Sequence, residues 1–481
     1  MKTLTARPVA PSLLLAALLG LSACTMGPNY QRPDVDVAPQ WRSAYTPGTV
    51  TLSSAWWRSF GDPALDELVR SALDDNKDLR MAVARIEQYE ARLQISQSAR
   101  YPQVDANGSR QRITMSQQRP VPLPANVAPT NNQYELGYGA SWEIDLWGRV
   151  KRSNEAALAE LLAVKENREA VVLSLVSELV ASYLNLLQLD RQLELMKARV
   201  ANREAVWKLL EGKAAGGAIA ALQVAQAKAV FEEARAELPL KEYEIALAEN
   251  NLNFLAGRNP GPIARGRRFE QLQVTGIPAG LPSELLQQRP DIRRAEQDLI
   301  AANARIGVAK AAYFPTLSLT GGAGYASTEL RNFGQLTSNF WNYGPQIAAT
   351  LFDGGRIAGN VREAEARQRE LVIAYQRAIQ AAFREVDDAL ARHKLLGDRI
   401  GVQQLQIAAT QEAARLARNR YEGGYSSYQE VLDAEALVLQ SQISNVNAQG
   451  NQLDALIAVF RTMGGGWTSQ AESLAAGAPR Q

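Results

Sequence analysis

The spacing of apolar residues predicts helices of unusual length. No glycine or proline occurs from Val150 to Glu211, and at 1.5 Å per residue such a helix is about 90 Å long. Along its second part, apolar residues recur in steps of three and four with one charged interruption, as in a coiled-coil seam. The seam consists of Leu186, Leu189, Leu193, Met196, Val200, Arg203, Trp207 and Leu210.

A second long helix is predicted over about 356–422, with breaks at Gly397 and Gly401. Each long helix is followed by a tip and a return helix, which we expect at 218–255 and 425–463. Shorter helices are predicted at 63–100 and 283–313. They end at Tyr101-Pro102 and Phe314-Pro315, because the residue before a proline disfavours the helical conformation.

Alternating patterns predict strands between these helices. Residues 134–145 place apolar and aromatic side chains on one face, and 314–325 and 341–352 are rich in aromatic residues, Thr and Gly. Strands of outer-membrane barrels have this length and alternation, but an ordinary soluble hairpin has them too. The face of the first segment carries Tyr134, Leu136, Tyr138, Ala140, Trp142 and Ile144.

The chain contains an internal repeat. Early matches lie 213 residues apart and later matches 207 apart, because the first half has a longer, proline-rich run at 119–129. Asp78, Arg80, Arg92 and Pro102 match Asp291, Arg293, Arg305 and Pro315, while Arg149, Gly216, Gly217, Val224 and Ala227 match Arg356, Gly423, Gly424, Val431 and Ala434. Each copy therefore reads helix, hairpin, long helix, tip and return helix.

The first residues have the character of an export signal. Lys2 and Arg7 precede an apolar run at 12–21 that is too short to span a bilayer. It ends in Leu21-Ser22-Ala23-Cys24, which resembles the bacterial lipobox, so we expect cleavage before Cys24 and acylation of that residue. An ordinary secretory peptide ending in cysteine is the alternative. Thr25 follows the cysteine in place of Asp, which by resemblance to lipoprotein sorting rules favours the outer membrane.

Composition excludes several function classes. The 52 basic and 50 acidic residues balance once Lys2 and Arg7 are removed, so no basic footprint for nucleic acid remains. With one cysteine and one histidine, the chain has no Cys/His metal cluster and no internal disulfide. His393 lies in a charged helical run and reads as a solvated or helix-packed side chain. We find no nucleophile–base pair and no phosphate loop, and we expect neither an enzyme nor a cofactor.

Two hairpins per chain cannot close a barrel, and lipid does not tolerate open sheet edges. Eight strands from two chains would enclose a filled lumen, whereas twelve strands from three chains leave a passage. Closure of the barrel therefore needs several chains, and of these two arrangements the twelve-stranded one leaves a passage.

Five motifs in order resemble one family. They are similar to motifs of outer-membrane efflux lipoproteins of the OprM/NodT type, relatives of TolC, and comprise Trp56 to Leu68, Asp145 to Arg149, Leu281 to Glu296, Phe314-Pro315 and Phe352 to Arg356. The resemblance runs from the lipobox to about residue 464. It implies an α+β chain of the outer membrane factor fold. Three chains would form a twelve-stranded membrane barrel that continues into a periplasmic helical barrel.

The resemblance also implies a function and partners. Members carry small toxic solutes or antibiotics from an inner-membrane RND pump, through a periplasmic adaptor, across the outer membrane. We expect 1–23 as the signal peptide, 24–60 as the lipid anchor and tail, 61–256 and 284–464 as the two repeats, 257–283 as an equatorial linker, and 465–481 as a C-terminal tail. The linker and tails would form a collar.

A passive duct needs a gate, which we place at the helix tips. Glycine pairs at the tips would end one helix in a left-handed cap and let an adaptor approach closely, and Ser426 or Ser427 would cap the return helix. For adaptor docking we expect Gly216, Gly217, Gly423, Gly424 and Ser427. The gate candidates are Tyr421, Tyr425, Ser426, Gln429 and Asp433, although the tyrosines could equally pack between helices.

Three rival functions stay open at this point. One is a type I protein-secretion channel, which this sequence does not separate well from a drug-efflux duct. Another is a metal-ion exporter, to which six Met and one His lend no support. The last is a periplasmic coiled-coil scaffold without a pore, against which the strand-like segments argue.

Overall fold

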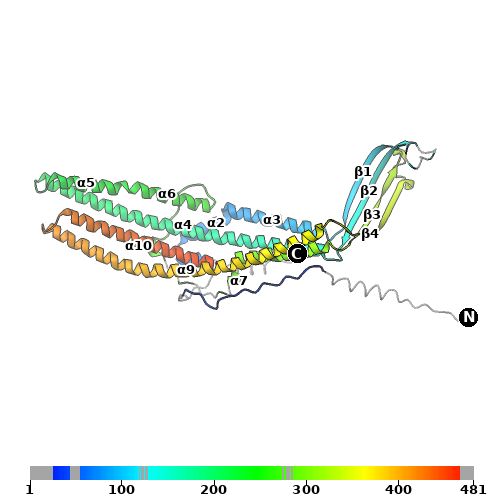
Figure 1. Ribbon diagram of the computed structural model, residues 1–481. Coiled ribbons are helices and arrows are strands. Elements are labelled where there is room, and N and C mark those ends of the chain that lie inside the picture. Colours follow the sequence, from blue (N-terminus) through cyan, green and yellow to red (C-terminus); the bar gives the residue numbers. More distant parts are fainter. Residues whose placement is uncertain are drawn as a thin grey trace. The chain divides into compact units, whose positions relative to one another are not determined.

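The computed structural model describes residues 25–43, 55–116, 118, 120, 124, 128–272, 276, 277, 282 and 285–465. These residues contain helices and one four-stranded sheet, joined by irregular segments (Figure 1). The strands are β1 (Gln103–Thr114), β2 (Thr130–Ile144), β3 (Thr316–Ser327) and β4 (Asn339–Ala348). The α-helices are α2 (Pro63–Asp75), α3 (Lys77–Ser98), α4 (Arg149–Ala215), α5 (Ala221–Ala236), α6 (Leu238–Leu255), α7 (Leu285–Gln288), α8 (Pro290–Ala311), α9 (Arg356–Glu422) and α10 (Tyr428–Thr462).

Several predicted features lie outside the described residues. They are the signal peptide at 1–23, the lipidated Cys24, most of the proline-rich run at 119–129, and the tail from residue 466 onward.

Two compact units divide the chain. The first takes its described residues from Met1–Asp34, Arg85–Val164 and Ala295–Tyr375 and contains the sheet with the adjoining helix ends. The second takes them from Val35–Ala84, Lys165–Arg294 and Gln376–Gln481 and contains the larger helical part. Each unit thus combines corresponding pieces of both repeats.

The sheet is antiparallel with the order β1-β2-β3-β4. Strand β2 pairs with β1 through Gln103↔Ser141 to Thr114↔Thr130, and with β3 through Tyr134↔Ser327 to Ile144↔Leu317. The three strands assigned from the pattern are present, with β4 shifted to begin and end earlier. We assigned no range to β1 from the pattern, because its sequence is almost entirely polar.

The long helices have the predicted extent. Helices α4 and α9 contain 67 residues each. The breaks predicted at Gly397 and Gly401 are wrong, since α9 continues through both positions. A glycine inside a helix costs only about 1 kcal/mol, so it does not by itself end a helix that has many turns on either side.

Three helices predicted as continuous are instead divided. The helix predicted over 63–100 breaks at Asn76, whose side chain accepts a hydrogen bond from Leu79 N and donates one to Leu255 O, both at 2.9 Å. The return helix predicted over 218–255 breaks at Glu237, because Pro239 has no N–H for the carbonyl of Arg235. The helix predicted over 283–313 is divided before Pro290, which begins α8.

The hydrophobic core of the second unit gathers the aromatic residues of the Trp56-Trp57 motif. Trp56 and Phe60 are 2% and 0% exposed, and the Trp56 ring stacks on Phe460 with centroids 5.0 Å apart. Tyr183 of α4 is also fully buried. The motif therefore closes the core between the first helices and the end of α10.

Among the described helices, α4 alone is long and apolar enough to cross a membrane by length and composition. Because 61% of its most apolar window is buried inside the structure, this helix is weak support for a membrane span.

Candidate functional site

The sheet has two chemically different faces. Side chains paired across the strands share a face, because pairing partners in an antiparallel sheet point the same way. One face carries Val104, Ala106, Tyr134, Leu136, Tyr138, Ala140, Trp142, Ile144, Leu317, Leu319, Ala323, Tyr325, Trp341, Tyr343 and Ile347. Toward the hairpin end this face becomes polar, with Arg110, Arg112, Thr114, Thr130, Asn132, Ser327 and Asn339. The other face is mostly polar and carries Gln103, Asp105, Asn107, Ser109, Gln111, Asn131, Gln133, Glu135, Ser141, Glu143, Thr316, Ser318, Thr320, Asn342 and Gln346, together with the apolar Ile113, Ala326, Phe340 and Ala348.

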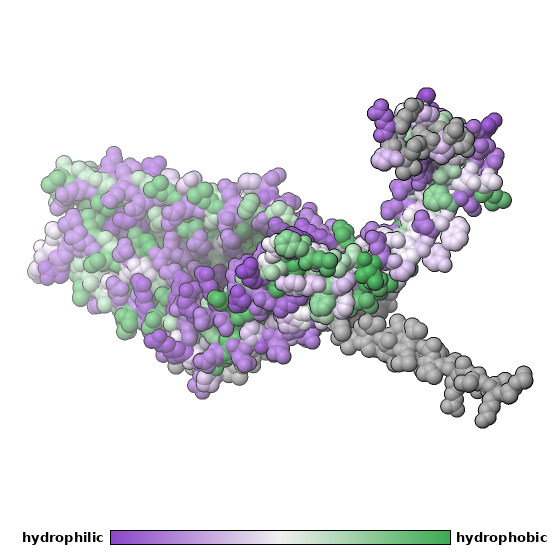
Figure 2. All heavy atoms as spheres, turned by 45° about the vertical axis from the view of Figure 1, so that its right-hand side comes forward, coloured by the Kyte–Doolittle hydropathy of each residue, from purple (hydrophilic) through white to green (hydrophobic). Residues whose placement is uncertain are grey.

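Large side chains of the apolar face are exposed in the single chain. Tyr138 is 64% exposed, Trp341 69% and Tyr343 78%. From Tyr134 to Ile144 the face is about 34 Å long at 3.4 Å per residue. At the usual barrel tilt this gives about 25 Å, the height of the apolar band of an outer-membrane barrel. Hydrophilic residues gather at the hairpin end of the sheet (Figure 2).

Both helix tips end in the same backbone motif. At the first tip Gly217 has φ +74°, Gly217 N donates to Ala214 O, and Ala218 N donates to Lys213 O, both at 2.9 Å. At the second tip Gly424 has φ +77° and donates to Tyr421 O at 3.0 Å. Tyr425 N donates to Arg420 O at 2.9 Å there. These are Schellman caps, so the left-handed caps predicted at the glycine pairs are present.

The residues predicted for the gate have different surroundings. The Tyr421 ring packs against Tyr428 with centroids 5.2 Å apart, whereas Tyr425 is 82% exposed. The side-chain amide of Gln429 donates to Asp433 Oδ1 at 2.8 Å. The structure thus brings Gln429 and Asp433 together and leaves Tyr425 on the surface of the chain.

The serine predicted to cap the return helix lies at the cap position but does not form the capping hydrogen bond. Ser427 occupies the N-cap of α10 but makes no capping bond through its side chain, and Glu430 N donates to its carbonyl at 3.2 Å. The hydroxyl of Ser426 is buried without a hydrogen-bond partner.

A buried ion triad near the tips was not predicted. Glu435 of α10 accepts from Arg203 Nη1 of α4 at 2.8 Å and also pairs with Arg418 of α9. The side chain of Arg203 is 4% exposed and that of Glu435 13%. The signal in the sequence was the charged interruption of the apolar seam at Arg203. We call these three residues the triad.

Aspartates begin both long helices at the strand-to-helix junctions. Asp145 accepts from the backbone N–H of Val150 and Lys151 at 3.0 and 2.7 Å. Asp353 accepts from Gly355 and Ile357 at 2.9 and 2.8 Å. These carboxylates satisfy the first N–H groups of α4 and α9, which explains why the two junction motifs resemble each other.

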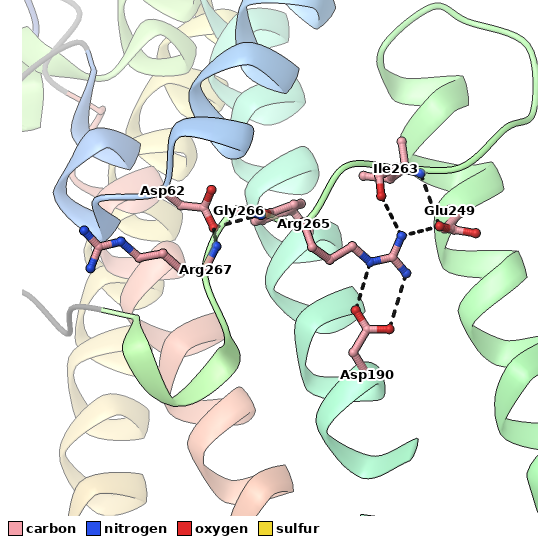
Figure 3. A network of polar contacts seen from close by, with 8 residues as sticks. Asp62, Asp190, Glu249, Ile263, Arg265, Gly266 and Arg267 are labelled. Atoms are coloured by element: carbon pink, nitrogen blue, oxygen red, sulfur yellow. Dashed lines mark hydrogen bonds and ion pairs between the residues drawn. The ribbon is translucent and has the colours of Figure 1, made fainter. Parts of the chain in front are cut away.

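The linker between the repeats is held to the helices by Arg265 and Asp62 (Figure 3). Arg265 pairs with Asp190 of α4 at 2.9 Å and with Glu249 of α6. Asp62 accepts from Tyr183 OH at 3.0 Å and from Arg267 N at 2.8 Å while it caps α2. Burial raises the pKa of the Tyr183 phenol, so that it remains a hydrogen-bond donor.

The Arg289-Pro290-Asp291 motif joins three helices at one point. Arg289 donates to Asp291 Oδ2 at 2.7 Å, to Glu385 of α9 at 2.8 Å and to the carbonyl of Thr462, the last residue of α10, at 3.1 Å. Burial opposes ionisation of Asp291, but the Arg289 guanidinium holds the pKa of its carboxyl below the ordinary value. The motif therefore has a structural role in the second unit.

No group of three or more His, Cys, Asp or Glu residues placed to hold a metal ion occurs in the part of the chain that the structure describes. The Nε2 atom of His393 is buried without a partner, and burial lowers the pKa of its ring.

A family model described as "Outer membrane efflux protein" matches residues 68–258 and 281–465. The chain belongs to this family. Its two matched segments coincide with the two copies of the internal repeat, so the predicted family and the predicted repeat are confirmed.

Similar proteins cover nearly the whole chain. The cation efflux system protein CusC of Escherichia coli O6:H1 is 35% identical, over 93% of this chain and 97% of that protein. The toluene efflux pump outer membrane protein TtgI of Pseudomonas putida is 34% identical, over 95% and 98%. The probable outer membrane lipoprotein SilC of Salmonella typhimurium is 33% identical, over 95% and 98%.

Solved structures agree on the fold. The open state of the MtrE outer membrane channel of Neisseria gonorrhoeae superposes with a TM-score of 0.82 at 32% identity, over 92% of this chain and 98% of that one. The CmeC outer membrane channel of Campylobacter jejuni gives a TM-score of 0.86 at 26% identity, over 94% and 98%. The chain is thus an efflux protein of the outer membrane with the outer membrane factor fold, as predicted.

Proposed function

We propose that three copies of this chain form the passive exit duct of a tripartite efflux system, gated at the periplasmic helix tips. The observation that carries this proposal is the two-faced sheet, with an apolar face of membrane height and a polar face opposite. Such a sheet fits a barrel wall between lipid and a water-filled lumen.

The unpaired edges of the sheet support the proposed trimer. Strands β1 and β4 each have a neighbour on one side only, and lipid does not tolerate an open edge. Joining β4 of one copy to β1 of the next closes the sheet. Three copies of four strands give the twelve-stranded barrel that leaves a passage.

The helical part has matching unpaired edges. Printed contacts order its helices α6, α4, α10 and α9: Gln192 of α4 accepts from Lys241, Arg203 pairs with Glu435, and Thr410 of α9 lies 3.1 Å from Ser441. The two outer helices, α6 and α9, expose apolar side chains at coiled-coil spacing. These are Leu240, Tyr243, Leu247 and Phe254 on α6, and Leu395, Val402, Leu405 and Leu416 on α9.

The anchor and the partners complete the proposal. Acylation of Cys24 would fix the chain to the outer membrane, because several acyl chains give stable anchoring where one does not. The tips would receive a periplasmic adaptor through Gly216, Gly217, Gly423, Gly424 and Ser427, and the gate would involve Tyr421, Tyr425, Ser426, Gln429 and Asp433. An inner-membrane RND pump would load the duct.

The cargo we propose is small toxic solutes, including antibiotics. Relatives of similar identity are named for cations and for toluene, which supports a duct for small solutes whose selectivity is set by the pump. Type I secretion of protein is the alternative.

The duct is tested by reconstituting the purified full chain in a planar bilayer after chemical cross-linking to determine its subunit number. We expect a cross-linked mass of three chains and discrete ion-conducting steps. A cross-linked species of another size, or a trimer that never conducts, would contradict the proposal and favour the scaffold.

A further inference from the structure

A cavity of about 510 Å³ lies between helices α4, α9 and α10 in the second unit. We call it the groove. Four charged side chains line it, two acidic and two basic, together with hydroxyl and small apolar side chains. The charged residues are Glu178 of α4, Arg392 of α9, and Asp454 and Arg461 of α10. The groove is therefore neutral as a whole but carries both signs of charge.

The four charges of the groove are unpaired. Among the residues that the structure describes, none forms an ion pair with any of them. Charges around the groove are paired by contrast, as Arg289 is with Asp291 at 2.7 Å. Asp454 is half-buried and the other three side chains are exposed. The groove thus offers charges of both signs to a ligand.

Asp454 is the strongest of these charges for binding. Burial raises the pKa of its carboxyl, and the charge of Arg392 opposes this rise. A half-buried carboxylate has lost part of its hydration. A cationic group placed against it forms a charge-assisted hydrogen bond in return, so Asp454 is the point at which we expect a cationic group to attach.

The N-terminal tail covers the opposite face of α9. The ring of Phe383 packs against Trp41 with centroids 6.2 Å apart. Asp387 Oδ1 accepts from Ser43 N at 3.1 Å. Because each residue of an α-helix adds about 100°, Arg392 lies about 180° round the helix from Phe383 and about 140° from Asp387. The tail and the groove are therefore on opposite sides of α9.

The linker has the same relation to α4. Asp190 and Glu194 pair with Arg265 and Arg268 of the linker, both at 2.9 Å. Glu178 lies about 120° round the helix from Asp190 and about 160° from Glu194. The groove thus opens on the side of these helices that faces away from both the tail and the linker.

In the proposed duct, that side is the wall of the lumen. Four helices from each of three copies make a ring of twelve, which at a spacing of about 10 Å is about 38 Å across between helix axes. Three tails and three linkers placed inside such a ring would obstruct the passage. They therefore belong outside it, and the three grooves face the lumen.

We infer that each groove is a lumenal binding site for small amphoteric solutes, which carry one cationic and one anionic group. The cationic group pairs with Asp454, and the anionic group pairs with Arg392 or Arg461. Because these pairs are open to water, binding is weak. Weak binding suits a duct, since a solute must leave the site as well as enter it. The inference deepens the proposed duct and rests on it.

The test compares two solutes that differ by one charged group. Ampicillin carries an amine and a carboxylate, whereas benzylpenicillin has the carboxylate without the amine. Saturation-transfer NMR measures their binding to the purified full chain, and single-channel recording in a planar bilayer measures their block of the ion current. The variants are Asp454→Asn and Arg392→Gln. Asp74→Asn is the matched control, because Asp74 of α2 is exposed and its carboxylate forms no ion pair with another described residue.

We expect the natural chain and Asp74→Asn to bind ampicillin about fivefold more tightly than benzylpenicillin, and ampicillin to block the current. Asp454→Asn should bind the two solutes equally, and Arg392→Gln should weaken the binding of both. Equal binding by the natural chain, a preference that survives Asp454→Asn, or binding without any block would overturn the inference. A preparation that never conducts would overturn the proposed duct instead.

Discussion

Glu435 is the residue whose replacement most directly tests how the tips are held closed. It is the single carboxylate of the triad, and it joins α10 to α4 through Arg203 and to α9 through Arg418. We hypothesise that the duct opens by an outward swing of α10, which would separate Glu435 from Arg203. Glu435→Gln should then favour the open state.

The magnitude follows from burial. Removing one partner of a buried ion pair costs about 3–5 kcal/mol. Because the side chain of Arg418 is 51% exposed, the Arg418–Glu435 pair contributes little to this cost. We therefore take the lower end of the range, about 3 kcal/mol. Such a change shifts the ratio of open to closed channels about 150-fold.

The assay is the open probability of single channels in a planar bilayer. The matched control is Glu412→Gln, which removes the partner of Arg415 on the same helix α9, where both side chains are more than half exposed; we expect no change from it. An unchanged open probability in Glu435→Gln, or an equal rise in the control, would refute the reasoning.

Three further predictions concern other parts of the chain. Gly424→Ala should strain the left-handed cap by about 1 kcal/mol and reduce pump-dependent efflux, which is measured as the efflux rate of a dye. Gly359→Ala, a control without such strain, should leave this rate unchanged. Asp105 and Glu135 lie on the polar face, and none of the described residues of β1 to β4 on that face is basic. The reversal potential in a salt gradient should therefore show cation selectivity, which Asp105→Asn with Glu135→Gln should weaken. Burial lowers the pKa of the His393 ring below its ordinary value of 6.5, so the unfolded chain binds this proton at a higher pH than the folded chain does. The free energy of unfolding should therefore fall as the pH drops below 6.5 and stay level above it. In urea unfolding, His393→Gln should remove this pH dependence, and an unaltered dependence of the free energy on pH would contradict the prediction.

Local signals were sufficient for the long helices and the tips. Helix α9 spans Arg356–Glu422 as predicted, because Asp353 with two glycines starts it and a glycine pair ends it. Its internal glycines misled the prediction, since their cost is small against the cooperativity of a long helix. Pro239 was visible in the sequence and should have divided the return helix.

Other features depend on residues far apart in the chain. The break at Asn76 is stabilised by the carbonyl of Leu255, 179 residues away, so helical periodicity could not reveal it. Strand β1 alternates between the two faces like any strand, but toward the hairpin its positions on the apolar face are Gly108, Arg110, Arg112 and Thr114, so it shows no regular apolar alternation. The triad needs the register of three helices, although Arg203 already stood out as a charge within an apolar seam.

The central claim, that the chain is an exit duct for small solutes docked through its tips, is tested most directly by the efflux rate of a preloaded fluorescent dye. We predict slower efflux from cells that lack the chain, with recovery by the intact chain but not by a variant altered at Gly423 and Gly424. Efflux that is unchanged by the deletion, in cells shown to have no other duct for the dye, would contradict the claim and favour secretion of protein.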